Sequence, residues 1–268
     1  MLMASERPHP PIGRTPTDYY SYPIYRHPAD ESPPLCPFSP TVSKIRTHVE
    51  RALQHPVNHV LIQLYRSGAD YISEHSDKTI DVVRDSRIVN LSLGARRTMT
   101  LKTKKDTLQT GHDDDDDGRE QQLAQRRTQR VPLPHNSLFV MGLETNARWM
   151  HSVHTDKRPD STKEPEERGA RISLTFRRIG TFLTPAAPHP QRIYGQGATR
   201  KTRAEAQPVV LGGAEAERLL AAFGAENHQS EFDWDEAYGE GFDVLHFAVA
   251  AAPREHAEGA SEAGGAKT

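Results

Sequence analysis

The strongest constraint on how this chain can fold lies in residues 171–177, where polar and apolar side chains alternate. In an extended strand, alternate side chains project to opposite faces. The polar face carries Arg171, Ser173, Thr175 and Arg177. Two guanidinium groups on one face must meet solvent, acidic side chains or a bound anion, because a buried unpaired charge is costly. The segment therefore predicts a strand whose polar face lines either an anion site or a network of ion pairs.

A second feature is the pair His75 and Asp77, within the segment 68–81. Two residues apart on an extended backbone, the imidazole and the carboxylate project from one face and can hold a metal ion between them. Far downstream, His151 and His154 each offer another imidazole. Three residues apart in a strand, these two point to opposite faces, so only one of them faces inward. Two histidines and one carboxylate form the facial triad that leaves positions open on non-haem Fe(II).

The order and spacing of these pieces resemble the AlkB family of Fe(II)/2-oxoglutarate-dependent dioxygenases. The resemblance extends from about Tyr20 to about Phe182. It rests on the segments 65–77, 88–95, 97–99, 136–141, 149–151 and 171–177. It implies a double-stranded β-helix (jelly roll) core that uses Fe(II), 2-oxoglutarate as cosubstrate, and O2.

By this resemblance the iron ligands are His75, Asp77 and His151, and no catalytic residue is expected beyond them. The sequence Trp-Met-His at 149–151 matches the context of the family's second histidine and favours His151 over His154. Without those neighbours, His151 would be one of 14 histidines in the chain, and a surface position would be the alternative.

The resemblance also implies a set of cosubstrate residues. Arg171 is expected to anchor the distal carboxylate of 2-oxoglutarate, since arginine grips a carboxylate through two parallel hydrogen bonds. Arg177 is expected near the carboxylate and keto group that chelate the iron. Tyr65 matches a tyrosine that hydrogen-bonds the cosubstrate, and Ser173 shares the polar face of the strand. Gln63 stands where the family usually has asparagine, and its side chain is one methylene longer.

Substrate contacts are expected from two places. Tyr19 and Tyr20 belong to the aromatic cluster 18–26, which either forms a lid that stacks on a flat substrate or packs against the core. In AlkB-like proteins a comparable segment covers the substrate pocket. Many nucleobase-repairing members carry an acid two positions after the metal-binding aspartate, where it contacts the exocyclic amine of a flipped base. Here that position is Thr79, which places base recognition in question.

The spacing of the apolar residues predicts a mainly β chain with flanking helices (α+β). Expected strands are 60–65, 88–93, 98–103, 137–141, 149–153 and the region 170–182. Expected helices are 43–53, with Ser43 as its cap, and 214–223, with Gly224 as its stop. A turn is expected near 144–146. Several short strands without βαβ spacing indicate an antiparallel double-sheet jelly roll.

Hydrophobic residues make up 35% of the chain, which is low for a chain folded from end to end and predicts disordered flanks. The acidic run Asp113–Asp117 indicates a solvated insertion, with a cation or a basic partner as the alternative. We expect a disordered start at 1–17 and an oxygenase domain at 18–185, with a disordered insertion at 104–130. A C-terminal extension packed on that domain is expected at 186–249, and a disordered tail at 250–268.

The formal net charge of −2 gives no global signal for nucleic acid, so any such contact must be local. A set of basic residues either contacts a nucleic-acid backbone or forms a solvated strand face: Arg96, Arg97, Lys102, Lys104 and Lys105. A single cysteine, Cys36, excludes an intrachain disulfide and a cysteine-based zinc site. No apolar run reaches membrane length, and no signal-peptide core is present, so we expect an intracellular monomer in the nucleus or cytoplasm.

Three functions remain open at this point. The first is oxidative demethylation of N-alkylated bases in DNA or RNA, by hydroxylation of the methyl group with release of formaldehyde, succinate and CO2. The second is the same oxygenase chemistry on a methylated protein or a small molecule. The third is an inactive jelly-roll module that binds a partner through residues 231–247. The complete ligand set and both arginines argue against the third, since a scaffold without activity has little physical reason to keep a costly polar cluster.

Overall fold

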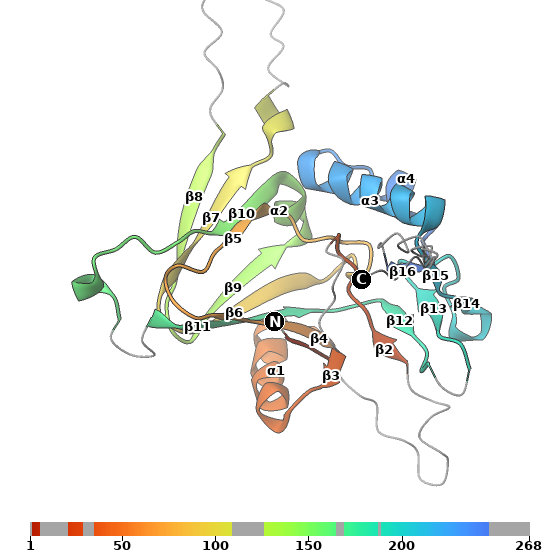
Figure 1. Cartoon of the computed structure of the whole chain (residues 1–268), viewed down its shortest axis with the longest axis horizontal. Helices are drawn as coiled ribbons and strands as arrows, with labels where there is room; N and C mark the ends of the chain where they lie inside the picture. Colours follow the sequence, from red (N-terminus) through yellow and green to blue (C-terminus); the bar gives the residue numbers. More distant parts are fainter. Residues whose placement is uncertain are drawn as a thin grey trace, which may run out of the picture.

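Two facing β-sheets form the centre of the molecule, as seen in the computed structural model (Figure 1). The structure describes residues 2–5, 21–28, 35–108, 126–164, 169–186 and 189–246. The predicted acidic run and the predicted tail 250–268 lie outside these residues, as do Tyr19 and Tyr20. Within the predicted disordered start, residues 2–5 instead form a strand of the larger sheet, and within the predicted insertion, residues 128–130 belong to a strand. The double sheet confirms the predicted strand-rich jelly roll.

The larger sheet has six strands in the order β3-β1-β4-β11-β6-β9. In chain order they are β1 (Leu2–Ser5), β3 (Leu35–Pro37), β4 (His59–Tyr65), β6 (Arg87–Gly94), β9 (Ser137–Gly142) and β11 (Arg171–Arg177). The facing sheet has the order β5-β10-β7-β8. Its strands are β5 (Ile72–His75), β7 (Arg97–Thr103), β8 (Thr128–Leu133) and β10 (Trp149–Val153).

Strand β11 lies between β4 and β6, with Arg171 opposite Tyr65 on one side and Gly94 on the other. Its polar face points into the space between the sheets, and its apolar face points outward. There, Leu174 and Phe176 pack in one core cluster with residues of α1 (Pro40–Leu53). Ile172, on the same apolar face, is 40% exposed, so this face is only partly covered.

The start of α1 differs from the prediction. The cap is Ser39, whose Oγ accepts a hydrogen bond from the backbone N–H of Val42, rather than Ser43. Pro40 then occupies the first turn, where a missing N–H costs nothing and the fixed φ suits the helix. The predicted turn near 144–146 is also wrong, because these residues lie in the short helix α2 (Leu143–Arg148).

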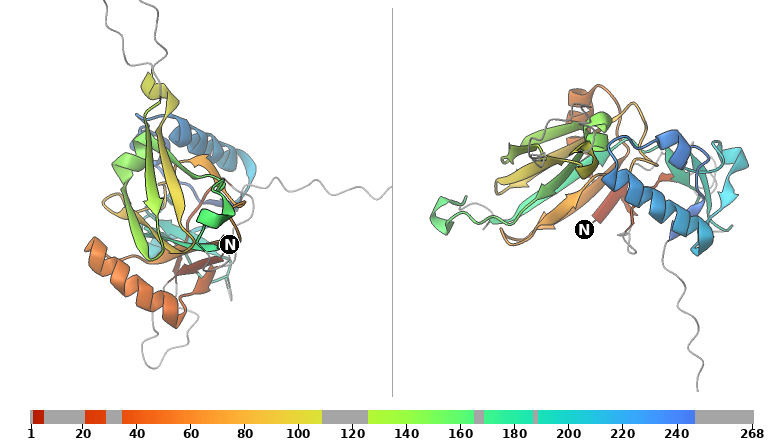
Figure 2. Two further views of the ribbon diagram at one scale, coloured as in Figure 1. Left: turned by 90° about the vertical axis from the view of Figure 1, so that its left-hand side faces the viewer. Right: turned by 90° about the horizontal axis from the view of Figure 1, so that it is seen from above.

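The chain after β11 forms a second, smaller unit of structure. A four-stranded sheet joins β2 (Tyr22–Pro23), β12 (Thr181–Leu183), β13 (Arg192–Gly195) and β14 (Gln207–Pro208). A parallel pair joins β15 (Val210–Leu211) and β16 (Val244–His246). Figure 2 shows helices α3 (Gly213–His228) and α4 (Trp234–Tyr238) beside this part of the molecule. Single turns of 3-10 helix lie at Lys105–Leu108, Asp160–Thr162 and Arg203–Glu205.

Helix α3 does not stop at Gly224, as predicted, but continues to His228. A glycine inside a helix costs only about 1 kcal/mol relative to alanine. Buried side chains on both sides of Gly224, among them Leu219, Phe223 and Glu226, hold the last turn against the core. Their packing outweighs the weak local preference of glycine.

Arg26 connects three parts of the chain that are far apart in sequence. Its guanidinium group pairs with Asp81, with 2.7 Å between Nη2 and Oδ1. It also donates to the backbone carbonyls of Gly197, Phe242 and Val244. The N-terminal segment, the loop after β5 and the C-terminal unit therefore share one buried charge pair.

In the described part of the chain, no helix is long and apolar enough to span a membrane.

We expect Arg26→Met to lower the free energy of unfolding by about 3–5 kcal/mol, because it leaves the Asp81 carboxylate buried without its cation. Urea denaturation of the full chain, followed by circular dichroism, measures the change. Arg66→Met is the matched control, since Arg66 forms an exposed pair with Asp70, and exposed ion pairs add little to stability. Equal losses in the two variants would contradict the proposed weight of the buried pair.

Candidate active site

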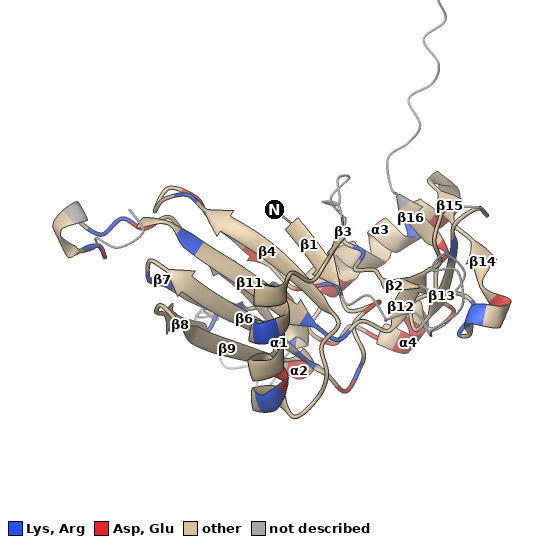
Figure 3. Ribbon diagram, turned by 90° about the horizontal axis from the view of Figure 1, so that it is seen from below, with Lys and Arg blue, Asp and Glu red and all other residues tan. Residues whose placement is uncertain are grey.

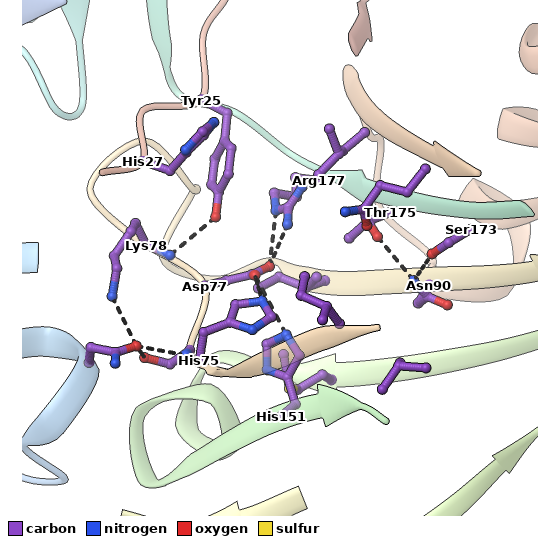
Figure 4. A pocket seen from close by; sticks show the side chains of 18 of the residues that line it. Tyr25, His27, His75, Asp77, Lys78, Asn90, His151, Ser173, Thr175 and Arg177 are labelled. Atoms are coloured by element: carbon purple, nitrogen blue, oxygen red, sulfur yellow. Dashed lines mark hydrogen bonds and ion pairs between the residues drawn. The ribbon is translucent and has the colours of Figure 1, made fainter. Parts of the chain in front are cut away.

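A cavity of about 510 Å³ lies between the two sheets. Its walls come from β4, β6, β9 and β11 on one side, and from β5, β7 and β10 on the other. Residues 25–28 and the last two turns of α3 complete the lining. Figure 4 shows the polar side chains that project into this space.

His75, Asp77 and His151 converge at one end of the cavity (Figure 4). The pairing of β5 with β10 places His75 opposite His151, with the two ring centroids 4.2 Å apart. Asp77 Oδ1 lies 3.9 Å from His75 Nε2 and 3.7 Å from His151 Nε2. One ligand atom from each residue thus lies within 4.8 Å of the other two, which fits three ligands on one face of a single ion.

The protonation states also suit metal binding. Ser73 O accepts a hydrogen bond of 2.8 Å from His75 Nδ1, so the proton is held there and the Nε2 lone pair faces Asp77. Burial, together with the neighbouring His75, lowers the pKa of His151 to about 3, which keeps its imidazole neutral. Burial opposes ionisation of Asp77, but Arg177 and the two histidines outweigh it and hold the pKa of that carboxyl well below its usual range.

Asn146 is a residue of the site that sequence reasoning missed. It is fully buried on α2 and brackets Asp77 from both sides of the backbone. Its Oδ1 accepts from Asp77 N at 2.9 Å, and its Nδ2 donates to Asp77 O at 2.9 Å. This double contact fixes the peptide that carries the predicted carboxylate ligand. No local pattern marks Asn146, because its partner lies far away in sequence.

Arg177 lies against the other oxygen of the same carboxylate. Its Nη2 and Nε contact Asp77 Oδ2 at 2.6 Å and 3.1 Å. The ring of Tyr25 covers the guanidinium group, 4.1 Å from its central carbon. Arg177 therefore orients Asp77 directly. Its predicted role beside the iron-chelating end of the cosubstrate stays a prediction.

Arg171 is the most informative charge in the cavity. It is 1% exposed, and none of the described carboxylates lies within ion-pair distance of it. Its Nη2 donates to Asn90 Oδ1 and Ser92 Oγ, while Nε and Nη1 have no hydrogen-bond partner among the described residues. Arg171 is thus a buried cation with open donors, no acidic partner among the described residues and a second cation, Arg97, nearby, so a bound anion would offset its desolvation. The arrangement fits the carboxylate of a bound ligand.

Neighbouring side chains hold Arg171 in place. The ring of Tyr65 lies 5.0 Å from the guanidinium carbon. Asn90 donates from Nδ2 to Ser173 Oγ and Thr175 Oγ1, at 2.6 Å and 3.0 Å, which turns its Oδ1 toward Arg171. Gln63 lines the same part of the cavity from β4. Sequence reasoning missed Asn90, although its even spacing with Ser92 in a predicted strand was a usable signal.

The remaining predicted residues lie elsewhere. His154 is exposed and points away from the cavity that His151 faces. Thr79 is buried and hydrogen-bonded through both its backbone N–H and its hydroxyl to Glu226, and the lining of the cavity does not include it. In the predicted basic set, Lys104 and Arg97 are buried and contact backbone carbonyls, so they cannot reach a phosphate backbone.

Comparison with known proteins adds independent findings. The model of the 2OG-Fe(II) oxygenase superfamily matches residues 10–177. Human "DNA oxidative demethylase ALKBH2" is 32% identical over 144 residues, which cover 53% of this chain and 48% of that protein. Human "Alpha-ketoglutarate-dependent dioxygenase alkB homolog 3" is 29% identical over 140 residues, 52% of this chain and 43% of that protein. The chain thus spans about half the length of these relatives.

We expect His151→Ala to weaken binding of a divalent cation by at least about 100-fold, because it removes one of three ligands from the triad. Calorimetric titration of the apoprotein with Mn(II) under anaerobic conditions measures the affinity. His154→Ala is the control. His154 follows β10 directly and is exposed, so this variant is expected to keep the affinity of the unsubstituted chain. Equal affinities in both variants would show that His151 is not a ligand.

Proposed function

The chain belongs to the 2OG-Fe(II) oxygenase superfamily and, within it, to the AlkB family, and on that premise we propose that it oxidatively demethylates N-alkylated bases in DNA or RNA. The observation that carries the proposal is that the His75, Asp77 and His151 triad shares one cavity with the unneutralised Arg171. A metal site and an anion site in one enclosed space are what a cosubstrate with a carboxylate at each end requires. The names of the relatives, among them a DNA oxidative demethylase, support the choice of substrate class.

The family implies Fe(II), 2-oxoglutarate and O2. In our proposal, His75, Asp77 and His151 hold the iron, and Arg171 receives the distal carboxylate of the cosubstrate through its open donors. Gln63, Tyr65, Ser173 and Arg177 line the remainder of the cosubstrate site. When bound, the iron and its cosubstrate would supply the chemistry that oxidises a substrate C–H bond.

The chain's own contribution is position and shelter. Asn90 and Tyr65 hold the guanidinium group of Arg171 in one orientation, so that its side chain loses little conformational entropy when an anion binds. Arg177 and Asn146 fix Asp77 from the side chain and the backbone. Apolar side chains such as Met99 and Val153 line the cavity and exclude water from the reacting atoms.

The overall reaction balances without a further reductant. One O2 oxidises 2-oxoglutarate to succinate and CO2 and delivers its second oxygen atom to the N-methyl group. The N–CH2OH product then breaks its C–N bond. The hydroxyl proton returns to the ring nitrogen, and formaldehyde leaves. Two electrons from 2-oxoglutarate and two from the methyl group account for the reduction of O2.

Contact with a nucleic acid rests on local charge, because the net charge of the chain is −2. In the view of Figure 3, Lys and Arg are spread over separate elements, among them α1 and β11. Arg127, just before β8, and Arg130, on β8, are exposed and remain available to phosphates. We propose that the protein binds nucleic acid and acts in the nucleus or the cytoplasm.

We expect Arg171→Leu to raise the dissociation constant for 2-oxoglutarate by at least about 30-fold, since losing one partner of a buried charge pair costs about 2–5 kcal/mol. Calorimetric titration of the Mn(II)-loaded protein without O2 gives the affinity. Arg130→Leu, an exposed arginine on β8, is the control and is expected to bind 2-oxoglutarate unchanged. Unchanged binding in Arg171→Leu would place the anion site elsewhere.

The activity itself is tested with the full chain, Fe(II), 2-oxoglutarate, O2 and oligonucleotides that carry single methylated bases. Mass spectrometry should detect the unmethylated base, with one succinate and one formaldehyde released for each base restored. The His75→Ala variant should release neither. Succinate formed with a methylated peptide or a small molecule, and no restored base, would overturn the nucleic-acid substrate while keeping the oxygenase chemistry.

A further inference from the structure

One wall of the cavity is built by helix α3, which lies beyond the segment that the superfamily model matches. The match ends at residue 177, whereas the lining includes Leu220, Phe223, Gly224, Asn227 and His228. Figure 1 shows α3 at the end of the double sheet, on the side of the C-terminal unit. This wall of the cavity therefore contains groups that lie outside the segment matched by the superfamily model.

Asn227 has a defined orientation. Its Oδ1 accepts from the backbone N–H of Ser76 at 3.0 Å and from Lys78 Nζ at 3.3 Å. Both partners are donors, so the amide atom that faces them must be the oxygen. The amide nitrogen is consequently directed away from Ser76 and Lys78. Its two N–H groups make no hydrogen bond with the described residues, and the side chain lines the cavity.

Lys78 adds another donor to the same wall. Its side chain is 5% exposed and lines the cavity, and its amino group contacts Asn227 Oδ1. A lysine amine donates hydrogen bonds whether or not it carries a proton charge. Figure 4 shows Lys78 near His75 of the triad. Lys78 and Asn227 therefore place their donors on one wall of the cavity.

Acceptors with a negative charge are scarce in the same space. Among the residues that line the cavity, Asp77 is the only carboxylate, and Arg177 and the two histidines engage it. Glu226, one position before Asn227, is turned into the protein. It accepts from the N–H and the hydroxyl of Thr79 and from the hydroxyl of Tyr238. No free carboxylate of the described lining is left to accept from an exocyclic amine.

Resting on the proposed function, we infer that the preferred substrate is a neutral N-methyl lactam base, in which a carbonyl oxygen lies next to the methylated ring nitrogen. 3-Methyluracil and 3-methylthymine have a carbonyl oxygen on each side of that nitrogen. Their carbonyl oxygen accepts from Asn227 Nδ2, with Lys78 as a second donor. 1-Methyladenine instead has an exocyclic N–H group on one side of its methylated nitrogen, a C–H group on the other, and a positive charge. It leaves the donors of Asn227 without an acceptor, and donors covered by a bound base without a partner are costly.

The test compares matched oligonucleotides that carry either 3-methyluracil or 1-methyladenine. We expect the unsubstituted chain to favour 3-methyluracil by at least about 10-fold in kcat/KM, which corresponds to one net hydrogen bond. Affinities measured anaerobically by fluorescence anisotropy should follow the same order. A ratio near one, or a preference for 1-methyladenine, would overturn the inference and leave the proposed function intact. No restored base of any kind would instead overturn the proposed function.

The variant Asn227→Asp assigns the preference to one group. It has the same shape and keeps an oxygen toward Ser76 and Lys78, but it replaces the N–H donors with an acceptor. We expect the ratio of 3-methyluracil to 1-methyladenine to fall by at least about 10-fold. Asn136→Asp, in an exposed turn, is the control and should leave the ratio unchanged. An unchanged ratio in a folded Asn227→Asp would remove Asn227 from substrate selection.

Discussion

The carboxylate of Asp77 is the contact on which the rest of the site depends. One oxygen faces His75 and His151, and the other is held by Arg177. Four segments therefore meet at one group: the end of β5, the loop after it, β10 and β11. A buried carboxylate is stable here only because cationic and polar partners surround it. The same partners keep it ionised, and an ionised carboxylate is what a divalent metal requires.

The C-terminal unit is tied to this loop as firmly as the sheets are. Glu226 accepts from Thr79 and Tyr238, and Arg26 joins Asp81 to backbone carbonyls of the C-terminal unit. Burial raises the pKa of Glu226, and its hydrogen-bond donors only partly offset that effect. The loop after β5, which carries the predicted metal ligand Asp77, is thus packed between the double sheet and α3. Its shape is set by both, which explains how a helix outside the matched segment can form a wall of the cavity.

Much of this arrangement follows from the sequence, and the missing part has a physical reason. The alternation in residues 171–177 predicts the strand and its polar face, because strand periodicity is a local property. The convergence of His75, Asp77 and His151 was accessible through spacing and resemblance. Asn146 and the wall of α3 were not, since each depends on contacts between segments far apart in the chain. Gly224 shows the same limit on a smaller scale, because tertiary packing extends helix α3 past its local stop signal.

The links from Arg26 to Phe242 and Val244 have a consequence for biosynthesis. These carbonyls belong to residues that leave the ribosome well after β11. A nascent chain that has emerged only as far as the double sheet would hold Arg26 and Asp81 with part of their shell missing. The loop that carries Asp77 and Asp81 therefore completes its contacts only after the C-terminal unit has emerged.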